Sequence, residues 1–347
     1  MITLKEIAEI CHVSTATVSN VLNGKAKAGE ETKKKIMEVI RETGYRPNAL
    51  AKGLRTKKTQ FIAVIVEDLG QFSSPPIISG ITERFEKEGY QVVLYNMRMY
   101  GRWSDTWYDR IELWHKELDP IMRTVYASNS CGVIYLAGHA RNIPCSNWTP
   151  PLPVVLTYAY SNHPDIPSIV IDDTAAAREL TAYLIGKGHK RIGFLGGRED
   201  NLHTSLRLGG YQEALREAGI AYDPAFVTFG NWERASGRDG AEILCKKGVT
   251  AVFVNSDRMA GGVYDYLEET GKQVGKDLSI AGFDNDTIAS YFRPALTTTE
   301  LPLIQIGQTS AEILLRQMQE GIRTAESPEV FRIPCVFKER SSVSEIS

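Results

Sequence analysis

The sequence of 347 residues predicts an N-terminal all-α helix-turn-helix head followed by an α/β body of two doubly wound lobes. First, residues 3–24 show two short helical patterns separated by a tight corner. Second, apolar runs alternate with amphipathic stretches from Phe61 onwards, as strands and helices do around a parallel sheet. Third, about 280 residues follow this alternation, which is too many for one such sheet.

The first helix of the head is expected to begin after Thr3, because Thr3 and Glu6 have the spacing of a capping box. The residues expected on its apolar face are Ile7, Ala8 and Ile10. Those expected in the corner are Cys11, His12 and Val13. Ser14 is a good N-cap for the second helix. A third helix is expected from Glu30 to Thr43, with Gly44 beyond its end.

The second helix is expected to separate its apolar and polar side chains. Its inward face consists of Val18, Val21 and Leu22. Its outward face consists of Thr15, Ala16, Ser19 and Asn20. A small polar face near a helix N-terminus suits insertion into the major groove of DNA. An ordinary three-helix packing unit would contain the same helix pair, so this pattern alone leaves both interpretations open.

Charge is distributed unevenly along the chain. Up to Thr59 there are twelve Lys and Arg against six acidic residues, a balance of +6. Because the whole chain has a net charge of -2, the remainder carries -8. A basic head on an acidic body indicates that the head is the part that contacts phosphates.

Two motifs at the N-terminus, TLKEIAEICHVSTATVSNVLNG and GYRPNALAKGLRTKKT, resemble the LacI/GalR family of transcriptional regulators. Further family motifs in the body are GHKRIGFLGG, SLRLGGY, NSDRMAGG, AGFDND and PALTTTE. The resemblance implies a periplasmic-binding-protein-like body whose chain crosses between lobes near Tyr160, Tyr291 and Arg323. The expected domains are a head at 1–45, a hinge at 46–60, an N-terminal lobe at 61–160 with 292–322, and a C-terminal lobe at 161–291 with 323–341.

The hinge is expected to contain one short helix, Ala49 to Leu54, which Asn48 can cap and Gly53 weakens. So short a helix does not hold without packing, so we expect it to form only when paired with a second copy on DNA. The resemblance implies that Leu54 wedges between base steps in the minor groove, beside Arg55. A plain linker is the alternative. The expected DNA-contacting residues are Ser14, Thr15, Ala16, Thr17, Ser19, Asn20, Tyr45, Leu54 and Arg55.

The resemblance also implies an effector site in the cleft between the lobes. Arg207 and Asp284 match the family's cleft arginine and carboxylate, a pair suited to sugar hydroxyls or a purine edge. Trp232 falls where the family has an aromatic wall, and Ser256 at a position that is often polar and contacting. Ser73 completes the expected effector set, and Asp257 is expected to cap its helix. The alternatives are a surface salt bridge for Arg207 and a lobe-core ring for Trp232.

Some residues depart from the family pattern. Ser73 lies in Gln71-Phe72-Ser73-Ser74, where Asn-Pro and two aromatics are usual, and Tyr158 replaces a frequent acidic residue. The stretch YGRWSDTWYDRIELW is rich in aromatics. Within it, one helix face is expected to carry Trp107, Ile111, Trp114 and Leu118, which favours packing over binding. Trp103 could reach the cleft from the preceding loop.

Other classes of protein are disfavoured by composition. No apolar run is long enough to span a membrane, and the acidic N-terminal residues do not suit a signal peptide. A cytoplasmic location in a bacterium, at the nucleoid, is therefore expected. The five cysteines are an odd number with no close pair, which argues against a disulfide framework and a zinc site, so neither a metal nor another cofactor is expected. A solute-binding protein would lack the basic head. An enzyme is disfavoured because nucleotide-binding glycine motifs are absent and the six histidines are scattered.

Together these features predict a sequence-specific, sugar-responsive transcriptional repressor. A homodimer is expected to bind a palindromic double-stranded DNA operator, with no membrane partner. A small-molecule effector, expected to be a carbohydrate, would close the cleft and change whether the two hinge helices can pair. Relief of repression is the expected response. A global regulator bound by a partner protein is the alternative.

Overall fold

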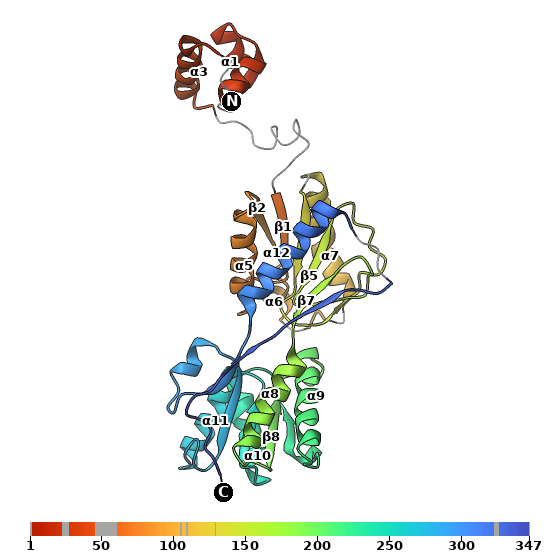
Figure 1. Ribbon diagram of the computed structural model, residues 1–347, viewed down its shortest axis with the longest axis vertical. Helices are drawn as coiled ribbons and strands as arrows, with labels where there is room; N and C mark the ends of the chain where they lie inside the picture. The colour runs from red at the N-terminus through yellow and green to blue at the C-terminus, as the bar shows by residue number, and fades with distance from the viewer. Residues whose placement is uncertain are drawn as a thin grey trace. The chain divides into compact units, whose positions relative to one another are not determined.

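The computed structural model describes residues 2–22, 28–45, 61–104, 106–108, 110–128, 130–322 and 326–346. They belong to two compact units, Met1–Gln60 and Phe61–Ser347 (Figure 1). The first unit is all-α in its described residues, and the second contains two parallel-rich sheets with helices. The predicted fold class is therefore confirmed.

The head consists of α1 (Leu4–Cys11), α2 (Thr15–Leu22) and α3 (Glu30–Thr43). The predicted capping box is present: Thr3 Oγ1 accepts from the Glu6 amide at 3.3 Å, and the Glu6 carboxylate accepts from the Thr3 amide at 2.7 Å. The three helices pack around Ile7, Val18 and Ile36, which are fully buried.

Ile10 was expected in this core but is 47% exposed. Cys11, expected in the corner, is the last residue of α1 and is buried instead. A helix turns by about 100° per residue, so Cys11 lies one turn above Ile7 between the directions of Ile7 and Ala8, whereas Ile10 lies on the side of Ile7 that faces away from Ala8.

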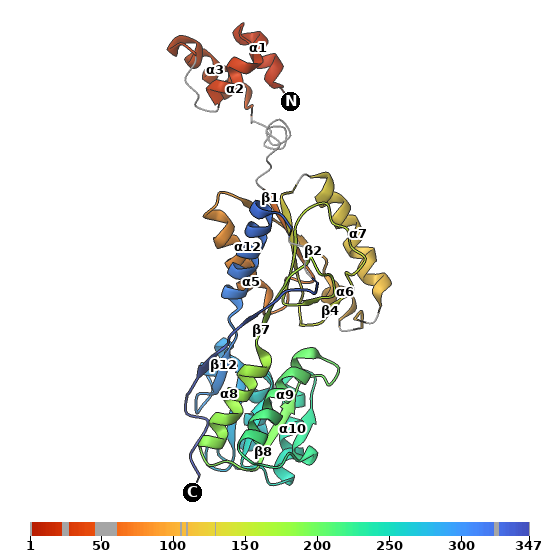
Figure 2. The same ribbon diagram turned by 45° about the vertical axis from the view of Figure 1, so that its right-hand side comes forward.

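The N-terminal lobe is built on a six-stranded parallel sheet of order β13-β7-β5-β3-β1-β2. Its strands are β1 (Phe61–Val66), β2 (Gln91–Asn96), β3 (Gly132–Leu136), β5 (Val154–Thr157), β7 (Ser168–Ile171) and β13 (Val330–Ile333). Its helices are α5 (Ser74–Glu86), α6 (Met99–Trp103), α7 (Ile111–Ala127) and α12 (Leu303–Glu320). Figure 2 shows α5 and α12 on one side of the sheet and α7 on the other. A small second sheet joins β4 (Asn142–Ile143) to β6 (Tyr160–Ser161).

The C-terminal lobe is built on a sheet of order β14-β12-β11-β10-β8-β9. Its strands are β8 (Ile192–Gly196), β9 (Val227–Phe229), β10 (Ala251–Val254), β11 (Ser279–Asp284), β12 (Thr297–Glu300) and β14 (Val336–Lys338). Its helices are α8 (Asp173–Gly186), α9 (Leu202–Glu217), α10 (Arg234–Lys246) and α11 (Asp257–Glu269), with short 3₁₀ turns at η1 (Pro224–Phe226) and η2 (Thr287–Ser290). The strand β14 is antiparallel to β12.

The chain crosses between the lobes later than predicted. It leaves the first sheet after Ile171, returns after Glu300, and leaves it again between Ile333 and Val336. The predicted crossings near Tyr160, Tyr291 and position 323 are therefore wrong, and the predicted lobe boundaries move with them. The strands β9, β12, β13 and β14, which sequence patterns did not identify, are short and carry polar residues, so no apolar run marks them.

Two expectations about burial also change. The strand β2 was expected to be buried, but it lies at the sheet edge and Leu94 is 44% exposed. Trp107 does not share a helix face with Trp114, because α7 begins only at Ile111, after the non-helical Arg110 (φ −110°, ψ 78°). Trp107 and Trp114 are buried, as packing predicts, whereas Ile111 is 47% exposed.

Candidate functional site

The start of α2 presents the small polar surface that the sequence predicted. Ser14 Oγ accepts from the Thr17 amide at 3.1 Å, so Ser14 caps the helix. Ser14, Thr15 and Ala16 are exposed, and Asn20 and Thr17 are half-buried. Side chains at such a helix start can contact base edges when the helix enters a major groove.

The remaining predicted DNA-contacting residues are less accessible or lie elsewhere. Ser19 is only 6% exposed, so its expected outward orientation is wrong. It lies at the margin of the apolar face of α2, where both α1 and α3 pack, and a side chain this small is covered there. Tyr45 is half-buried against the head core. Leu54 and Arg55 lie outside the described residues.

In the body, the carboxyl ends of strands from both sheets meet, which is where ligands bind in doubly wound folds. The contacts that join the lobes there include a hydrogen bond and two ring contacts. The Ala140 amide donates to His203 Nε2 at 3.1 Å. The rings of Tyr158 and His203 lie 5.1 Å apart between centroids. The His139 ring is stacked on Trp232 at 6.2 Å and 18°.

Arg207 is buried and held in one position. Its Nε donates to Asp173 Oδ1 at 2.8 Å, and its Nη1 donates to the Asn255 carbonyl at 2.6 Å. The guanidinium carbon lies 3.8 Å from the centroid of the Phe283 ring. The alternative of a surface salt bridge is therefore excluded, and the ion-pair partner of Arg207 is Asp173, not Asp284.

Asp173 joins Arg207 to the lobe contact. It also accepts from His203 Nδ1 at 2.8 Å. Burial opposes ionisation of Asp173, but His203 and Arg207 outweigh it and hold the pKa of this carboxyl below its ordinary value. The sequence showed no pattern that marked Asp173 or His203, which lie 30 residues apart.

Asp284 lies at the end of β11 with a positive φ of 113°. Burial raises its pKa to about 7, although Arg207 lowers it. The neighbouring Asp257 is fully buried, and burial together with Asp284 raises its pKa well above the ordinary value. Asp284 is thus poised between its charged and neutral forms at neutral pH.

The expected cap of α11 is corrected from Asp257 to Ser256. Ser256 Oγ accepts from the Met259 amide at 3.2 Å. Asp257 instead accepts from Thr298 Oγ1 at 2.6 Å and from the Asp286 amide at 2.8 Å. Ser256 has the extended backbone that an N-cap needs, whereas Asp257 is already the first helical residue.

Trp232 lies at the lobe contact with its ring against Gly197, where a Cβ would come within 2.2 Å of the indole. Its Nε1 is buried without a hydrogen-bond partner among the described residues. Ser73 is buried inside the N-terminal lobe, where its hydroxyl donates to the Gly138 carbonyl at 3.4 Å. Ser73 is therefore connected to the contact between the lobes through its bond to Gly138.

A buried network in the N-terminal lobe was not predicted. Glu67 accepts from Tyr135 Oη at 2.6 Å, from the Gly138 amide at 2.8 Å, and from Arg141. The Arg141 guanidinium lies 4.3 Å from the Trp107 ring centroid. Burial raises the pKa of Glu67, and Arg141 opposes that rise. The available signal was the position of Glu67 directly after the predicted strand 61–66, whereas Arg141 lies four residues beyond the residue that follows the predicted strand 132–136.

Several other buried polar atoms in the strand-end loops and nearby segments have no hydrogen-bond partner within the part of the chain that the structure describes. They are Asn255 Oδ1 and Nδ2, Thr204 Oγ1, Arg141 Nη1 and Trp107 Nε1. Leaving a buried polar group unpaired costs about 1–3 kcal/mol, so such groups favour a ligand or ordered water.

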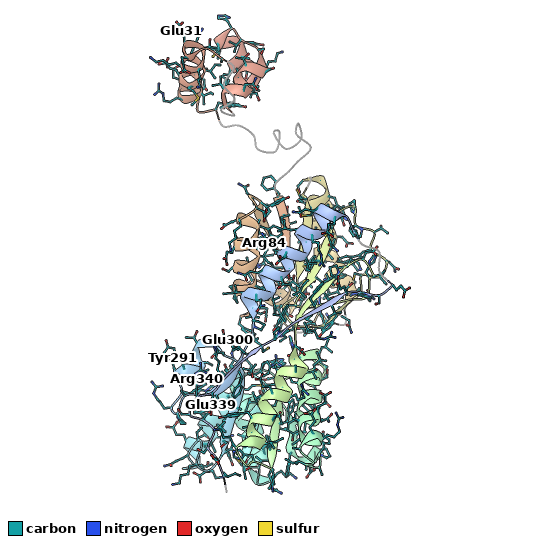
Figure 3. All side chains as sticks on the ribbon, in the orientation of Figure 1. Glu31, Arg84, Tyr291, Glu300, Glu339 and Arg340 are labelled. Atoms are coloured by element: carbon teal, nitrogen blue, oxygen red, sulfur yellow. The ribbon has the colours of Figure 1, made fainter. Side chains whose placement is uncertain are left out.

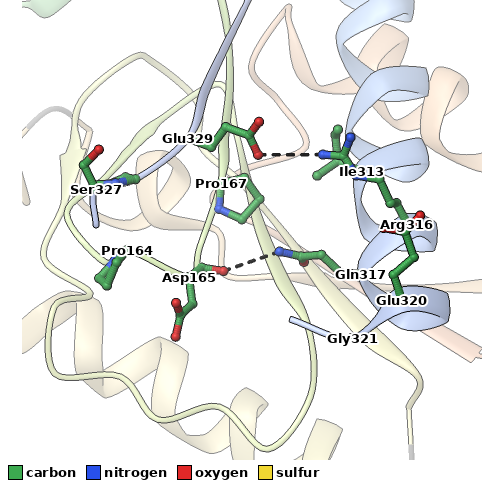
Figure 4. Close-up of a pocket in the computed structure, with 11 residues that line it drawn as sticks. Pro164, Asp165, Pro167, Ile313, Arg316, Gln317, Glu320, Gly321, Ser327 and Glu329 are labelled. Atoms are coloured by element: carbon green, nitrogen blue, oxygen red, sulfur yellow. Dashed lines mark hydrogen bonds and ion pairs between the residues drawn. The ribbon is translucent and has the colours of Figure 1, made fainter. Parts of the chain in front are cut away.

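A separate cavity of about 460 Å³ lies on the N-terminal lobe, beside the end of α12 (Figure 4). Gln317 Nε2 donates to the Asp165 carbonyl across it at 3.4 Å, and Arg316 faces Glu329 at 3.7 Å. None of the predicted effector residues lines this cavity.

Within the described ranges, no cluster of His, Cys, Asp and Glu is arranged to hold a metal ion. Within the same ranges, none of the five cysteines forms a disulfide. None of the described helices is long and apolar enough to cross a membrane.

Comparison with known proteins places these features in context. Residues 3–48 match the model for bacterial regulatory proteins of the lacI family, and residues 181–343 match a periplasmic binding protein-like domain. Catabolite control protein A of Priestia megaterium is 32% identical over 327 residues, which cover 92% of this chain and 93% of that protein.

Solved structures that resemble the whole chain include two with a bound ligand in their description. The lac repressor dimer bound to operator and the anti-inducer ONPF has a TM-score of 0.80 at 25% identity, covering 99% of each chain. The transcriptional regulator CelR–cellobiose complex has a TM-score of 0.67 at 25% identity, covering 99% of this chain and 100% of that one.

Proposed function

This chain belongs to the LacI family of bacterial regulatory proteins, and from that premise we propose that it is a dimeric repressor controlled by a carbohydrate bound between its lobes. As a family member it is a DNA-binding transcriptional regulator with a ligand-binding body. The observation that carries the finer proposal is the group of buried, unpartnered polar atoms around the fixed Arg207.

The chemistry of these groups supports a polyhydroxylated effector. Trp232 Nε1 can only donate, whereas the Asn255 amide and the Thr204 hydroxyl can both donate and accept. Asp284 accepts when ionised. A sugar carries donors and acceptors on adjacent carbons and an apolar C–H face for Trp232, so it can satisfy all of them. The cellobiose complex of a structural neighbour is consistent with this class.

For DNA we propose that Thr15, Ala16 and Asn20 contact bases, with Ser14 and Thr17 at the helix start. Leu54 and Arg55 remain assigned by the family resemblance alone. Operator binding requires access to the chromosome, so we place the protein in the bacterial cytoplasm.

A two-fold symmetric operator requires two heads, and we propose a homodimer. Tyr291, at the end of η2 in the C-terminal lobe, is 70% exposed (Figure 3). Because aromatic rings are enriched in protein interfaces, we propose Tyr291 as one contact with a second copy of the chain. Effector binding would shift the populations of the lobe arrangements, and this shift would change whether the hinges can pair. We propose that the effector relieves repression.

The Asn255 side chain provides the test, because its amide is unpartnered while its backbone carbonyl holds Arg207. Asn255→Ala should abolish or weaken sugar binding by about tenfold or more while leaving thermal stability unchanged. Isothermal calorimetry against cellobiose, D-ribose and adenosine would measure it. Asn142→Ala, at an exposed position of β4, is the matched control.

Equal sugar affinity for the parent and Asn255→Ala would exclude the surroundings of Asn255 and Arg207 as the effector site. Adenosine binding more tightly than either sugar would overturn the carbohydrate class. A global regulator bound by a partner protein is the remaining candidate, and it would show no response to any of the three compounds.

A further inference from the structure

The loop between β3 and β4 is anchored at both ends to one buried carboxylate. Glu67 Oε2 accepts from the Gly138 amide at 2.8 Å, and Glu67 Oε1 accepts from Arg141 Nη2. Gly138 also packs under Tyr100, where a Cβ would come within 2.6 Å of the ring. We call residues 138–141 the finger. Its two ends are fixed to the N-terminal lobe, so it has little freedom to shift as a whole.

The two middle residues of the finger contact the C-terminal lobe. His139 stacks on Trp232, and the Ala140 amide donates to His203 Nε2 at 3.1 Å. His203 Nδ1 is directed to Asp173, which also holds Arg207. The finger therefore contacts the aromatic wall directly and the buried arginine through two side chains.

The stacking distance decides what else Trp232 can hold. The centroids of His139 and Trp232 lie 6.2 Å apart. A third ring between them would need two contact distances, about 7 Å or more in total. The Trp232 face that His139 covers therefore cannot carry an effector ring at the same time.

We propose that His139 occupies the effector's stacking place in the free protein and is a specificity-determining residue, because a ligand must replace its ring to bind. This inference rests on the proposed function, in which Trp232 carries the effector. A cyclic sugar replaces one ring face with another and recovers the stacking. An acyclic sugar alcohol offers the same hydroxyls but no ring, so the site should favour cyclic saccharides over alditols.

The His139 imidazole is uncharged when a ligand replaces it against Trp232. Burial, together with His203 and Arg207, lowers the pKa of His139 to about 3. Tyr100 flanks the ring edge-on at 5.8 Å, and the other charged groups near it are Arg141 and Arg198. Displacement should consequently not depend on pH between pH 5 and pH 8 through His139 itself.

The first test needs no ligand. Acrylamide quenching of Trp232 fluorescence, taken as the difference between each protein and its Trp232→Phe counterpart, reports the exposure of this ring. His139→Ala should increase quenching, and His139→Phe should restore the protection. His115→Ala is the matched control. On α7, His115 pairs with Asp119 and lies edge-on against Trp114, far in sequence from Trp232, so its replacement should leave this difference unchanged. Unchanged quenching in a folded His139→Ala protein would overturn the proposal.

The second test uses calorimetry to compare D-ribose with its acyclic alcohol ribitol, and cellobiose with cellobiitol, in which one of the two rings is opened. In His139→Ala the cyclic probe should bind about three- to tenfold more tightly, the range that an aromatic pair is worth. Weaker binding of the cyclic probe would show that His139 contacts the ligand directly and would overturn the proposal. If no probe binds parent or variant, the carbohydrate effector is rejected, and the quenching result still decides where His139 lies in the free protein.

Discussion

The start of α2 and the contact between the two lobes place their polar side chains in opposite surroundings. Thr15 and Ala16 are exposed, and the polar bonds given for the described start of α2, such as that between Ser14 and Thr17, are local. At the lobe contact, Arg207 and Asp173 are almost fully buried and bonded to each other and to residues distant in sequence. Thr15 and Ala16 can therefore be substituted without affecting the core of the head. Substitution of Arg207 or Asp173 would affect the core of the body.

The largest expected effect comes from breaking the buried pair in the body. Arg207→Ala leaves Asp173 charged and buried, which should destabilise the body by about 3–5 kcal/mol. The control Arg178→Ala breaks the exposed Arg178–Glu217 pair and should cost at most about 1 kcal/mol. Urea unfolding of the body measures both. Similar costs for the two variants would contradict the difference between buried and exposed sites.

Base reading by the head is the next largest effect. Replacing Thr15 and Asn20 together by Ala should change the preferred half-site, because each lost base contact is worth about 1–3 kcal/mol. The stability of the head should hardly change. Selection of bound sequences from random duplexes measures the preference, and an unchanged consensus would reject these two residues as base contacts.

Asp284→Asn should change the stability of the body and its effector affinity in opposite directions. The unfolded carboxyl ionises at about pH 4, and the folded one has a pKa of about 7. The parent therefore loses stability as pH rises from about 4 to 7, because folding disfavours the charged form. Asp284→Asn should therefore stabilise the body at pH 8 and change its stability little at pH 4.

The same change should weaken effector binding, because the amide cannot accept as a carboxylate does. In the parent, effector affinity should rise with pH through about 7, since hydroxyl donors favour the ionised form. Thermal unfolding and calorimetry at pH 5 and pH 8 measure the two effects. A parent affinity that falls with rising pH would exclude Asp284 as an acceptor.

The smallest expected effect is that of Ser19→Ala. Ser19 is buried in the head, so its loss should leave the half-site consensus unchanged, in contrast to Thr15 and Asn20. Selection from random duplexes under identical conditions makes the comparison direct. A shifted consensus would mean that Ser19 reaches DNA in the bound state.

The features that sequence alone determined are local ones. The capping box of Thr3 and Glu6, the cap at Ser14 and the span of α3 from Glu30 to Thr43 all match the structure. Each depends on hydrogen bonds or side-chain spacing within a few residues, which a single stretch of sequence displays completely. Apolar runs such as that of β1 likewise indicate a buried strand without reference to its partner.

Only the tertiary structure decided which polar groups become partners. Arg207 was expected to face Asp284, but its bond is to Asp173, 34 positions away, and Glu67 meets Arg141 from 74 positions away. The sheet that each short strand joins, and hence where the chain crosses between lobes, was decided in the same way. Such pairs form because parallel strands bring their carboxyl ends to a common edge, and the order of strands at that edge depends on packing across the whole lobe.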